Sequence, residues 1–342
     1  MPVGISSPAR NLFLLGSSGD ALVTNFFKSI DKSSSFDEVY VPKKVRYRYS
    51  DDSYILAGYA QDGNSRRLSW VENRTYNPDN ASSTEVWHHE LESLDFVSNA
   101  SDSSTSLYNL CIDGNGNLFA VGESNNTNWI AKYNSFGGLQ WASTTYRGLS
   151  DYKGVASDGE CCYVTGEFAR VSFSEAQSVV EKYDYDGTPL WGTVVKFDGE
   201  EVSLKDIGVT SDGNVIAVGN INFDYGYMVK LDSGTGQVLW DKTFKSPIYR
   251  GGFSTEPQNV RAEKLFGDGK GHIYIIGRIL YGADYNSFLI KCDPEGNIIW
   301  LRTAVGSANE SVEFFDISAE TETEQVIAVS YTHLTLPTKR IV

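Results

Sequence analysis

Cysteine and histidine are the side chains of this sequence best suited to nucleophilic chemistry or transition-metal binding, and both are scarce. The 342 residues hold four cysteines and four histidines. Cys161 and Cys162 are adjacent, but no CxxC pair occurs, so we expect no structural zinc site. His88 and His89 follow each other on a predicted strand, where neighbouring side chains point to opposite faces. A three-histidine metal site is therefore not expected, and we predict no metal centre.

Acidic turns offer a second kind of chemistry, calcium binding. Asp113, Asn115 and Asn117 in DGNGN match the first half of an EF-hand loop, but the later glycine and distant glutamate are absent. We interpret these residues as hairpin-turn residues, and Asp184 and Asp186 in DYDG likewise. The sequence contains no GxSxG nucleophile elbow and no P-loop for phosphate. We therefore predict no catalytic residues.

The formal net charge of −15 bears on the class of partner. An acidic surface repels phosphate backbones, so we expect no nucleic-acid partner. The charge either keeps the protein soluble or attracts cations and basic partners. No apolar run approaches the roughly 20 residues of a membrane helix, so no transmembrane segment is predicted. Aromatic residues make up 13% of the chain, which favours strands.

A short apolar stretch that ends in glycine recurs along the chain. It reads NLFLLG, SYILAG, NLFAVG, CCYVTG, NVIAVG and HIYIIG, and its glycines are Gly16, Gly58, Gly122, Gly166, Gly219 and Gly277. The glycines are about 42 to 64 residues apart, a period typical of propeller blades. A lysine-bearing strand and a glycine-containing turn follow the later copies. Each copy then closes at a tryptophan: Trp141, Trp191, Trp240 or Trp300, with Trp87 in a looser copy.

Each unit therefore predicts four strands joined by Asp-Gly or Asn-Gly turns. The fold class is all-β, a β-propeller of four-stranded antiparallel blades. About six units and the opening of another are present, and we expect a monomeric propeller whose parent has seven or eight blades. A set of lysines recurs at one strand position and is interpreted as structural: Lys132, Lys182, Lys230 and Lys291.

Both ends of the sequence depart from the repeat. The segment PVGISSPARNLFLLG, residues 2–16, aligns with DIGVTSDGNVIAVG, so the chain begins inside the first strand of a unit and we expect residues 1–328 to be an incomplete propeller. After QVIA the repeat predicts a glycine, but the chain reads VSYTHLTLPTKRIV. That tail matches the translation of a transposon-based sequencing adapter. We therefore expect residues 329–342 to be an adapter-encoded, non-native segment.

The segment KLDSGTGQVLW, from Lys230 to Trp240, resembles the tryptophan-docking motif of quinoprotein (PQQ-type) propellers. In that family, glycine and tryptophan interlock neighbouring blades. The unit is also similar to the SBBP-type repeats of bacterial surface propellers. The resemblance covers most of the chain from about Leu107 onward and implies an architecture rather than an activity. The residues that it assigns to blade docking are Asp232, Gly236 and Trp240; Asp184, Gly187 and Trp191; Asp293, Gly296 and Trp300; and, more loosely, Asn134, Gly138 and Trp141.

Function in a repeat protein lies where the units differ. Here the variable loops follow the strand-ending glycines, and in a propeller such loops gather on one face of the disc. Our first interpretation is a non-catalytic binding or structural module with an unknown protein or glycan ligand. We expect it to belong to a secreted, periplasmic or cell-surface protein. The candidate binding residues are Asp224, Tyr225, Arg250, Tyr281, Asp284 and Tyr285.

Two alternatives remain. A quinoprotein-type dehydrogenase would use PQQ and calcium, with an Asp or Glu base and cationic partners in the central funnel. Some members of that family carry a disulfide between adjacent cysteines. Cys161 and Cys162 take ordinary strand positions of the repeat, so the sequence does not decide whether they form a disulfide. The second alternative is a carbohydrate-binding or hydrolytic propeller. Glycosylation also stays open, at sequons headed by Asn73, Asn80, Asn99, Asn125 and Asn309.

Overall fold

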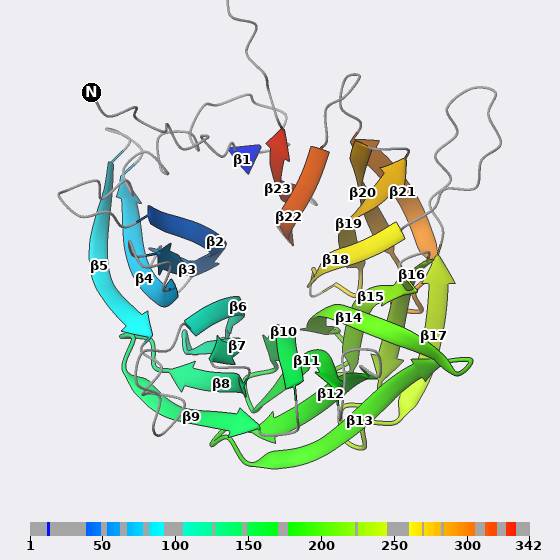
Figure 1. Cartoon of the computed structure of the whole chain (residues 1–342), viewed down its shortest axis with the longest axis horizontal. Helices are drawn as coiled ribbons and strands as arrows, with labels where there is room; N and C mark the ends of the chain where they lie inside the picture. The colour runs from blue at the N-terminus through cyan, green and yellow to red at the C-terminus, as the bar shows by residue number, and fades with distance from the viewer. Residues whose placement is uncertain are drawn as a thin grey trace, which may run out of the picture.

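The computed structural model describes residues 12–13, 39–48, 53–61, 67–77, 82–91, 105–124, 127–145, 149–169, 177–222, 225–244, 260–268, 270–281, 284–304, 312–319 and 326–332. These residues form 23 β-strands joined by turns (Figure 1). Within them, no helix is long and apolar enough to cross a membrane.

Twenty of the strands make five antiparallel groups of four, blades 1 to 5. Blade 1 holds β2 (Val39–Arg48), β3 (Ser53–Gln61), β4 (Arg67–Asn77) and β5 (Ser82–Leu91). Blade 2 holds β6 (Thr105–Ile112), β7 (Leu118–Ser124), β8 (Thr127–Tyr133) and β9 (Leu139–Thr145). Blade 3 holds β10 (Leu149–Ser157), β11 (Cys161–Ala169), β12 (Gln177–Asp184) and β13 (Pro189–Phe197). Blade 4 holds β14 (Glu200–Val209), β15 (Val215–Ile221), β16 (Tyr225–Leu231) and β17 (Val238–Phe244). Blade 5 holds β18 (Val260–Gly267), β19 (Ile273–Tyr281), β20 (Asp284–Cys292) and β21 (Ile298–Ala304).

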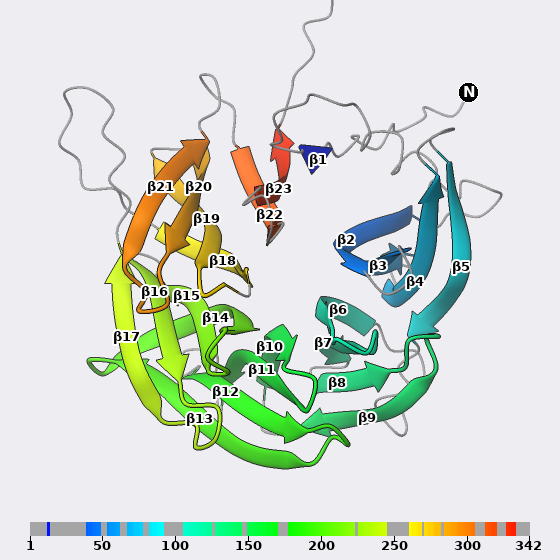
Figure 2. The same ribbon diagram turned by 180° about the vertical axis from the view of Figure 1, so that it is seen from behind.

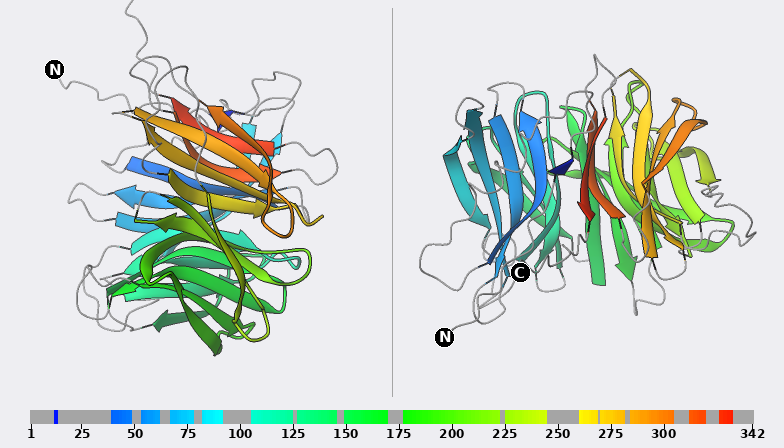
Figure 3. Two further views of the ribbon diagram at one scale, coloured as in Figure 1. Left: turned by 90° about the vertical axis from the view of Figure 1, so that its right-hand side faces the viewer. Right: turned by 90° about the horizontal axis from the view of Figure 1, so that it is seen from above.

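The blades follow one another around a central axis, with the first strand of each blade innermost (Figures 1 and 2). Seen from the side, the strands stand roughly upright in a disc (Figure 3). A three-stranded sheet of β22 (Val312–Ala319), β23 (Val326–Thr332) and β1 (Leu12–Phe13) lies between blades 5 and 1. The predicted β-propeller of four-stranded antiparallel blades is confirmed. The rest of the unit around Gly16 lies outside the described residues.

The glycine of each repeat marks a close approach of two strands. In blades 2 to 5 the innermost strand skips one residue in its pairing with the second strand, opposite Gly122, Gly166, Gly219 or Gly277. A Cβ at any of these glycines would overlap a carbonyl oxygen of the innermost strand. The repeat therefore conserves a bulge rather than a turn at this point.

A second glycine docks each blade onto the one before it. Gly187, in the β12–β13 turn, adopts φ 89° and lies against the indole of Trp141 from blade 2. A Cβ on Gly187 would come within 2.8 Å of that ring. The same arrangement joins Trp191 to Gly236. It also joins Trp240 to Gly296, while Trp87 meets Gly137 rather than the neighbouring Gly138.

The recurring lysines bind the same turns. Lys132 Nζ and Trp141 Nε1 both donate to the backbone oxygen of Tyr185, at 3.1 and 3.0 Å. Lys182 and Trp191 share the backbone oxygen of Ser233 in the same way, at 2.9 and 3.1 Å. A tryptophan and a lysine of one blade thus hold one turn of the next.

Serines near the start of the third strand add a contact that the repeat pattern did not indicate. Ser178 Oγ of blade 3 donates to the backbone oxygen of Val202 at 2.6 Å and accepts from the Leu204 N–H of blade 4 at 2.8 Å. Ser287 of blade 5 accepts from the Phe314 N–H at 2.8 Å, so β22 continues the ring.

The hydrophobic core consists of layers between blades, and each layer uses residues of two consecutive blades.

Blades 3 and 4 share a direct hairpin. Asp198 and Gly199 have φ of 47° and 82°, the positive values that a tight two-residue turn requires. Lys196 pairs with Glu201 across it, so β13 and β14 form one continuous ladder.

We predict that Gly166→Ala destabilises the protein by about 3 kcal/mol, the upper part of the usual range for overpacking, because the new methyl group meets backbone of β10. Gly114→Ala is the control, since no heavy atom lies within 4 Å of its Cβ position, and it should change stability by less than about 0.5 kcal/mol. Urea unfolding of the two variants measures the difference. Equal free energies of unfolding would contradict this account of the repeated glycine.

Candidate functional site

The bulge of each innermost strand carries a residue whose type is not fixed by the repeat. The skipped residues are Lys43, Tyr108, Lys153, Lys205 and Glu263 in blades 1 to 5, and Phe315 in β22. The backbone geometry repeats at this position, whereas the side chain is lysine in three of these strands and tyrosine, glutamate or phenylalanine in the others. In a repeat protein such a position is the expected place for function.

In blades 2 and 3 the bulge residues lie against each other. Lys153 Nζ sits 4.2 Å from the centroid of the Tyr108 ring and 2.9 Å from Asp151 Oδ2. The Tyr108 hydroxyl donates to Glu123 Oε2 at 2.7 Å. Glu123 directly follows the strand glycine Gly122, so the bulge places the tyrosine beside it.

Blades 3 and 4 are joined by the equivalent acidic residue of β11. Glu167 Oε1 pairs with Lys205 Nζ at 3.0 Å and accepts a hydrogen bond from the Ser203 hydroxyl. Burial raises the pKa of Glu167, but the Lys205 ammonium, the Ser203 hydroxyl and the more distant Lys153 outweigh burial and lower the pKa below its ordinary value. Glu167 therefore stays ionised at neutral pH.

Blade 5 completes the set with Arg278 Nε and Glu263 Oε1, 3.0 Å apart. We name the following residues the axial cluster: Tyr108, Glu123, Asp151, Lys153, Glu167, Lys205, Glu263 and Arg278. All eight are half-buried. The cluster holds four carboxylates and three cations, so its charge is close to balanced. Such a group offers paired hydrogen bonds and charges of both signs rather than one dominant field.

A buried polar group next to the bulges ties three innermost strands together. Asp206 accepts from the Asn109 side chain at 2.7 Å and from the Leu265 N–H at 3.1 Å, and Lys264 Nζ lies 3.7 Å away. Gly154 of β10 packs on the Asp206 backbone. Because Gly154 has no side chain, Asn109 of β6 can reach past β10 to Asp206. Asp206 is 3% exposed. Its oxygens are thus used within the protein, which does not favour it as the base of a quinoprotein site.

The loop residues predicted to bind a ligand are only partly described. Asp224 and Arg250 lie outside the described residues. Tyr225 begins β16 and is 37% exposed. Tyr281 ends β19 and pairs in register with Asp284, and Leu280 pairs with Tyr285. The structure therefore brings three of the six residues to the end of one hairpin. The binding role of all six residues stays a prediction.

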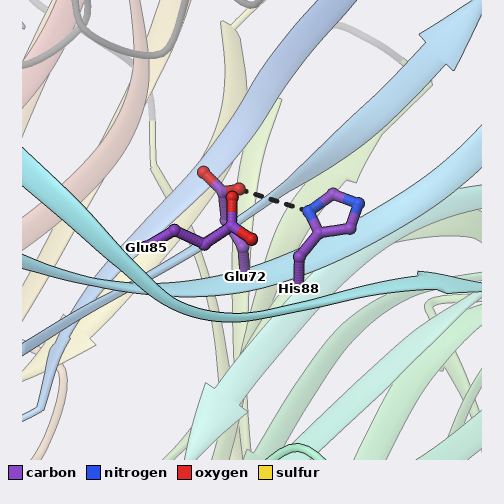
Figure 4. Close-up of side chains that lie close together, drawn as sticks. All are labelled: Glu72, Glu85 and His88. Atoms are coloured by element: carbon purple, nitrogen blue, oxygen red, sulfur yellow. Dashed lines mark hydrogen bonds and ion pairs between the residues drawn. The ribbon is translucent and has the colours of Figure 1, made fainter.

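The outer strands of blade 1 hold a cluster that the sequence analysis missed (Figure 4). Glu72, Glu85 and His88 each offer a ligand atom within 4.8 Å of the others. Arg74 lies among them, with Nε 2.6 Å from Glu72 and an Nη 3.6 Å from Glu85. His88 Nδ1 is 3.2 Å from the other Glu72 oxygen. Arg74 pairs with both carboxylates, so these side chains form an ion-pair network.

The remaining residues singled out for chemistry take structural positions. Asp113 accepts from the Asn115 and Asn117 N–H groups at 2.8 Å, and from the Tyr185 hydroxyl at 2.6 Å, which closes the β6–β7 turn. All four cysteines are free thiols. Cys161 packs between blades 3 and 4 but Cys162 packs between blades 2 and 3, and burial raises the pKa of both.

Comparisons with known proteins support the fold alone. No family model and no curated protein matches the sequence. The chain is similar to the Pan2 WD40 domain of Neurospora crassa, with a TM-score of 0.52 and 9% identity over 86% of this chain and 88% of that one. It is more distantly similar to the quinohemoprotein alcohol dehydrogenase of Comamonas testosteroni, with a TM-score of 0.39 and 14% identity over 63% of this chain and 38% of that one. The first likeness is that of a β-propeller; the second is too low to carry a conclusion.

The Glu72 network predicts an acid-dependent loss of stability. Burial raises the pKa of Glu72, but His88 and Arg74 outweigh burial and lower it. A carboxyl whose pKa is lowered by folding stabilises the protein above its unfolded pKa of about 4.3, and that stability is lost as the pH falls through the folded pKa. We expect Glu72→Gln to cost about 3 kcal/mol at pH 7, because Arg74 loses a buried partner. The cost should decrease progressively as the pH falls below about 4.3 toward the lowered pKa of Glu72.

Urea unfolding across this pH range measures the difference. Glu201→Gln, at an exposed position of β14, is the control and should show no comparable trend. A cost of Glu72→Gln that is the same at pH 7 and pH 3.5 would contradict the assignment.

Proposed function

We propose that this chain is a non-catalytic binding module that holds a peptide segment of a partner protein at the axial cluster. The observation that carries the proposal is a bulge whose backbone is repeated but whose skipped residue is tyrosine in blade 2, lysine in blades 3 and 4, and glutamate in blade 5. Structural residues of the ring recur instead, as the docking tryptophans and lysines do. Half-buried charges that differ between blades are suited to reading a sequence of side chains.

The pairing within the cluster fits a peptide better than a strongly charged ligand. Each charged residue already has a partner of opposite sign within 3.0 Å or a tyrosine hydroxyl at 2.7 Å. A ligand with a single dominant charge would leave some of these groups unpaired, and unpaired groups oppose binding. A peptide offers amide donors and acceptors as well as side chains of both signs.

Selection from a random dodecapeptide library on the immobilised chain tests this proposal. We expect enriched peptides whose Kd rises at least about tenfold in the double variant Lys205→Gln with Glu263→Gln. Lys196→Gln, on the exposed part of β13, is the matched control and should bind as the parent does. Selected peptides that bind the double variant unchanged would overturn the site. Binding on a glycan array that the double variant abolishes would replace the peptide with a carbohydrate and overturn the ligand.

We further propose that the module belongs to a secreted or cell-surface protein, on the strength of the SBBP-type resemblance and the acidic charge. Amplifying and sequencing the source DNA across both ends of the reading frame tests this. We expect a signal peptide upstream, and a frame that continues through the codon of Val329 into further propeller units. A source sequence that encodes SYTHLTLPTKRIV and then stops would show that the tail is native.

A further inference from the structure

We propose that the face of Tyr108 and the carboxylates around it form a subsite for one cationic side chain of the partner, an ammonium or guanidinium group. Lys153 fills this subsite when no partner is bound. The inference rests on the proposed function, because it names the ligand group that one part of the axial cluster accepts.

The subsite has the two components that recognise such cations. An aromatic face attracts a cation within about 6 Å of its centroid, and Lys153 Nζ lies 4.2 Å from that of Tyr108. A carboxylate, Asp151, receives a hydrogen bond from the same ammonium at 2.9 Å. The protein's own lysine therefore shows where the charged group of a ligand would lie.

The charges around the subsite favour a cation. Glu123, Asp151 and Glu167 contribute three negative charges, and once Lys153 has moved out only Lys205 contributes a positive charge. A partner's ammonium or guanidinium group takes the place of the Lys153 charge. The net charge of −15 on the whole chain also steers basic segments toward the protein.

Lys153 can leave the subsite at low cost, unlike the structural lysines. Its side chain is 24% exposed and that of Asp151 is 33% exposed, and ion pairs at such positions contribute little to stability. Lys132, in contrast, is 6% exposed and also donates to the backbone oxygen of Tyr185. The flexible stem of Lys153 lets its ammonium group move into solvent when a competing cation arrives.

The subsite belongs to one place in the ring. Tyrosine occupies the bulge position only in blade 2, and the lysine beside it is the bulge residue of blade 3. The other skipped residues are Lys43, Lys205, Glu263 and Phe315. A partner therefore binds in one orientation, set by where its cation docks.

Three fluorescein-labelled Gly-Ser dodecapeptides test the subsite, with arginine, glutamate or glutamine at the same three spaced positions. We expect the arginine peptide to bind the parent chain most tightly. Tyr108→Leu should weaken that binding about fivefold or more, the loss of one exposed cation–aromatic contact, and Tyr108→Phe should retain it. Phe136→Leu, an exposed aromatic in the β8–β9 turn, is the control.

For the Lys153→Met variant, the direction of the change in affinity for the arginine peptide decides whether Lys153 occupies the subsite. Removing the resident ammonium empties the subsite, so this variant should bind the arginine peptide several-fold more tightly than the parent does. Weaker binding by Lys153→Met, or unchanged binding by Tyr108→Leu, would overturn the subsite. If the glutamate or glutamine peptide binds best and the Lys205 and Glu263 double variant loses it, the proposed function stands without this subsite. If no peptide of the library or of this set binds, both fail. Thermal melting confirms that each variant is folded.

Discussion

The absence of a side chain at one position of the second strand in blades 2 to 5 is the constraint on which this ring depends. The carbonyl oxygen of the innermost strand occupies the place of a Cβ at Gly122, Gly166, Gly219 and Gly277. That close approach permits the bulge, and the bulge turns one residue of each innermost strand out of the ladder. The glycine is therefore constant among these blades, whereas the skipped residue, next to the one that pairs with the glycine, is not.

Contacts between consecutive blades convert the repeat into a ring. A tryptophan, a lysine and a serine of one blade each reach backbone of the next, at Tyr185, Ser233 or the start of the following innermost strand. Main-chain partners place few demands on the neighbour's sequence beyond a glycine in its turn. Each blade can thus change the residue at its bulge without weakening the blade-to-blade contact, which is how a repeat fold separates stability from recognition.

The sequence was sufficient for the architecture because its signals are local. Glycine turns, strand patterns and tryptophans recur within each unit, and they predicted four-stranded blades correctly. The same signals did not predict the contacts that depend on the register between paired strands. Tyr108, Lys153, Lys205 and Glu263 align as one column between an apolar and a mostly polar residue, but only the strand register shows that each of them is the residue skipped at a bulge. Glu72 and His88 are 16 residues apart and meet only because β4 and β5 pair at that point.

A ring of unlike charges near the axis must also be stable without a ligand. Half-buried charges cost solvation energy, and unpaired ones would destabilise the innermost strands that carry them. The axial cluster meets this requirement with internal partners, such as Asp151 for Lys153 and Ser203 with Lys205 for Glu167. Under the proposed function, a partner would bind by exchanging one set of pairs for another rather than by satisfying vacant groups. Such exchange yields modest affinity and strong discrimination, because a wrong side chain leaves two groups unpaired instead of one.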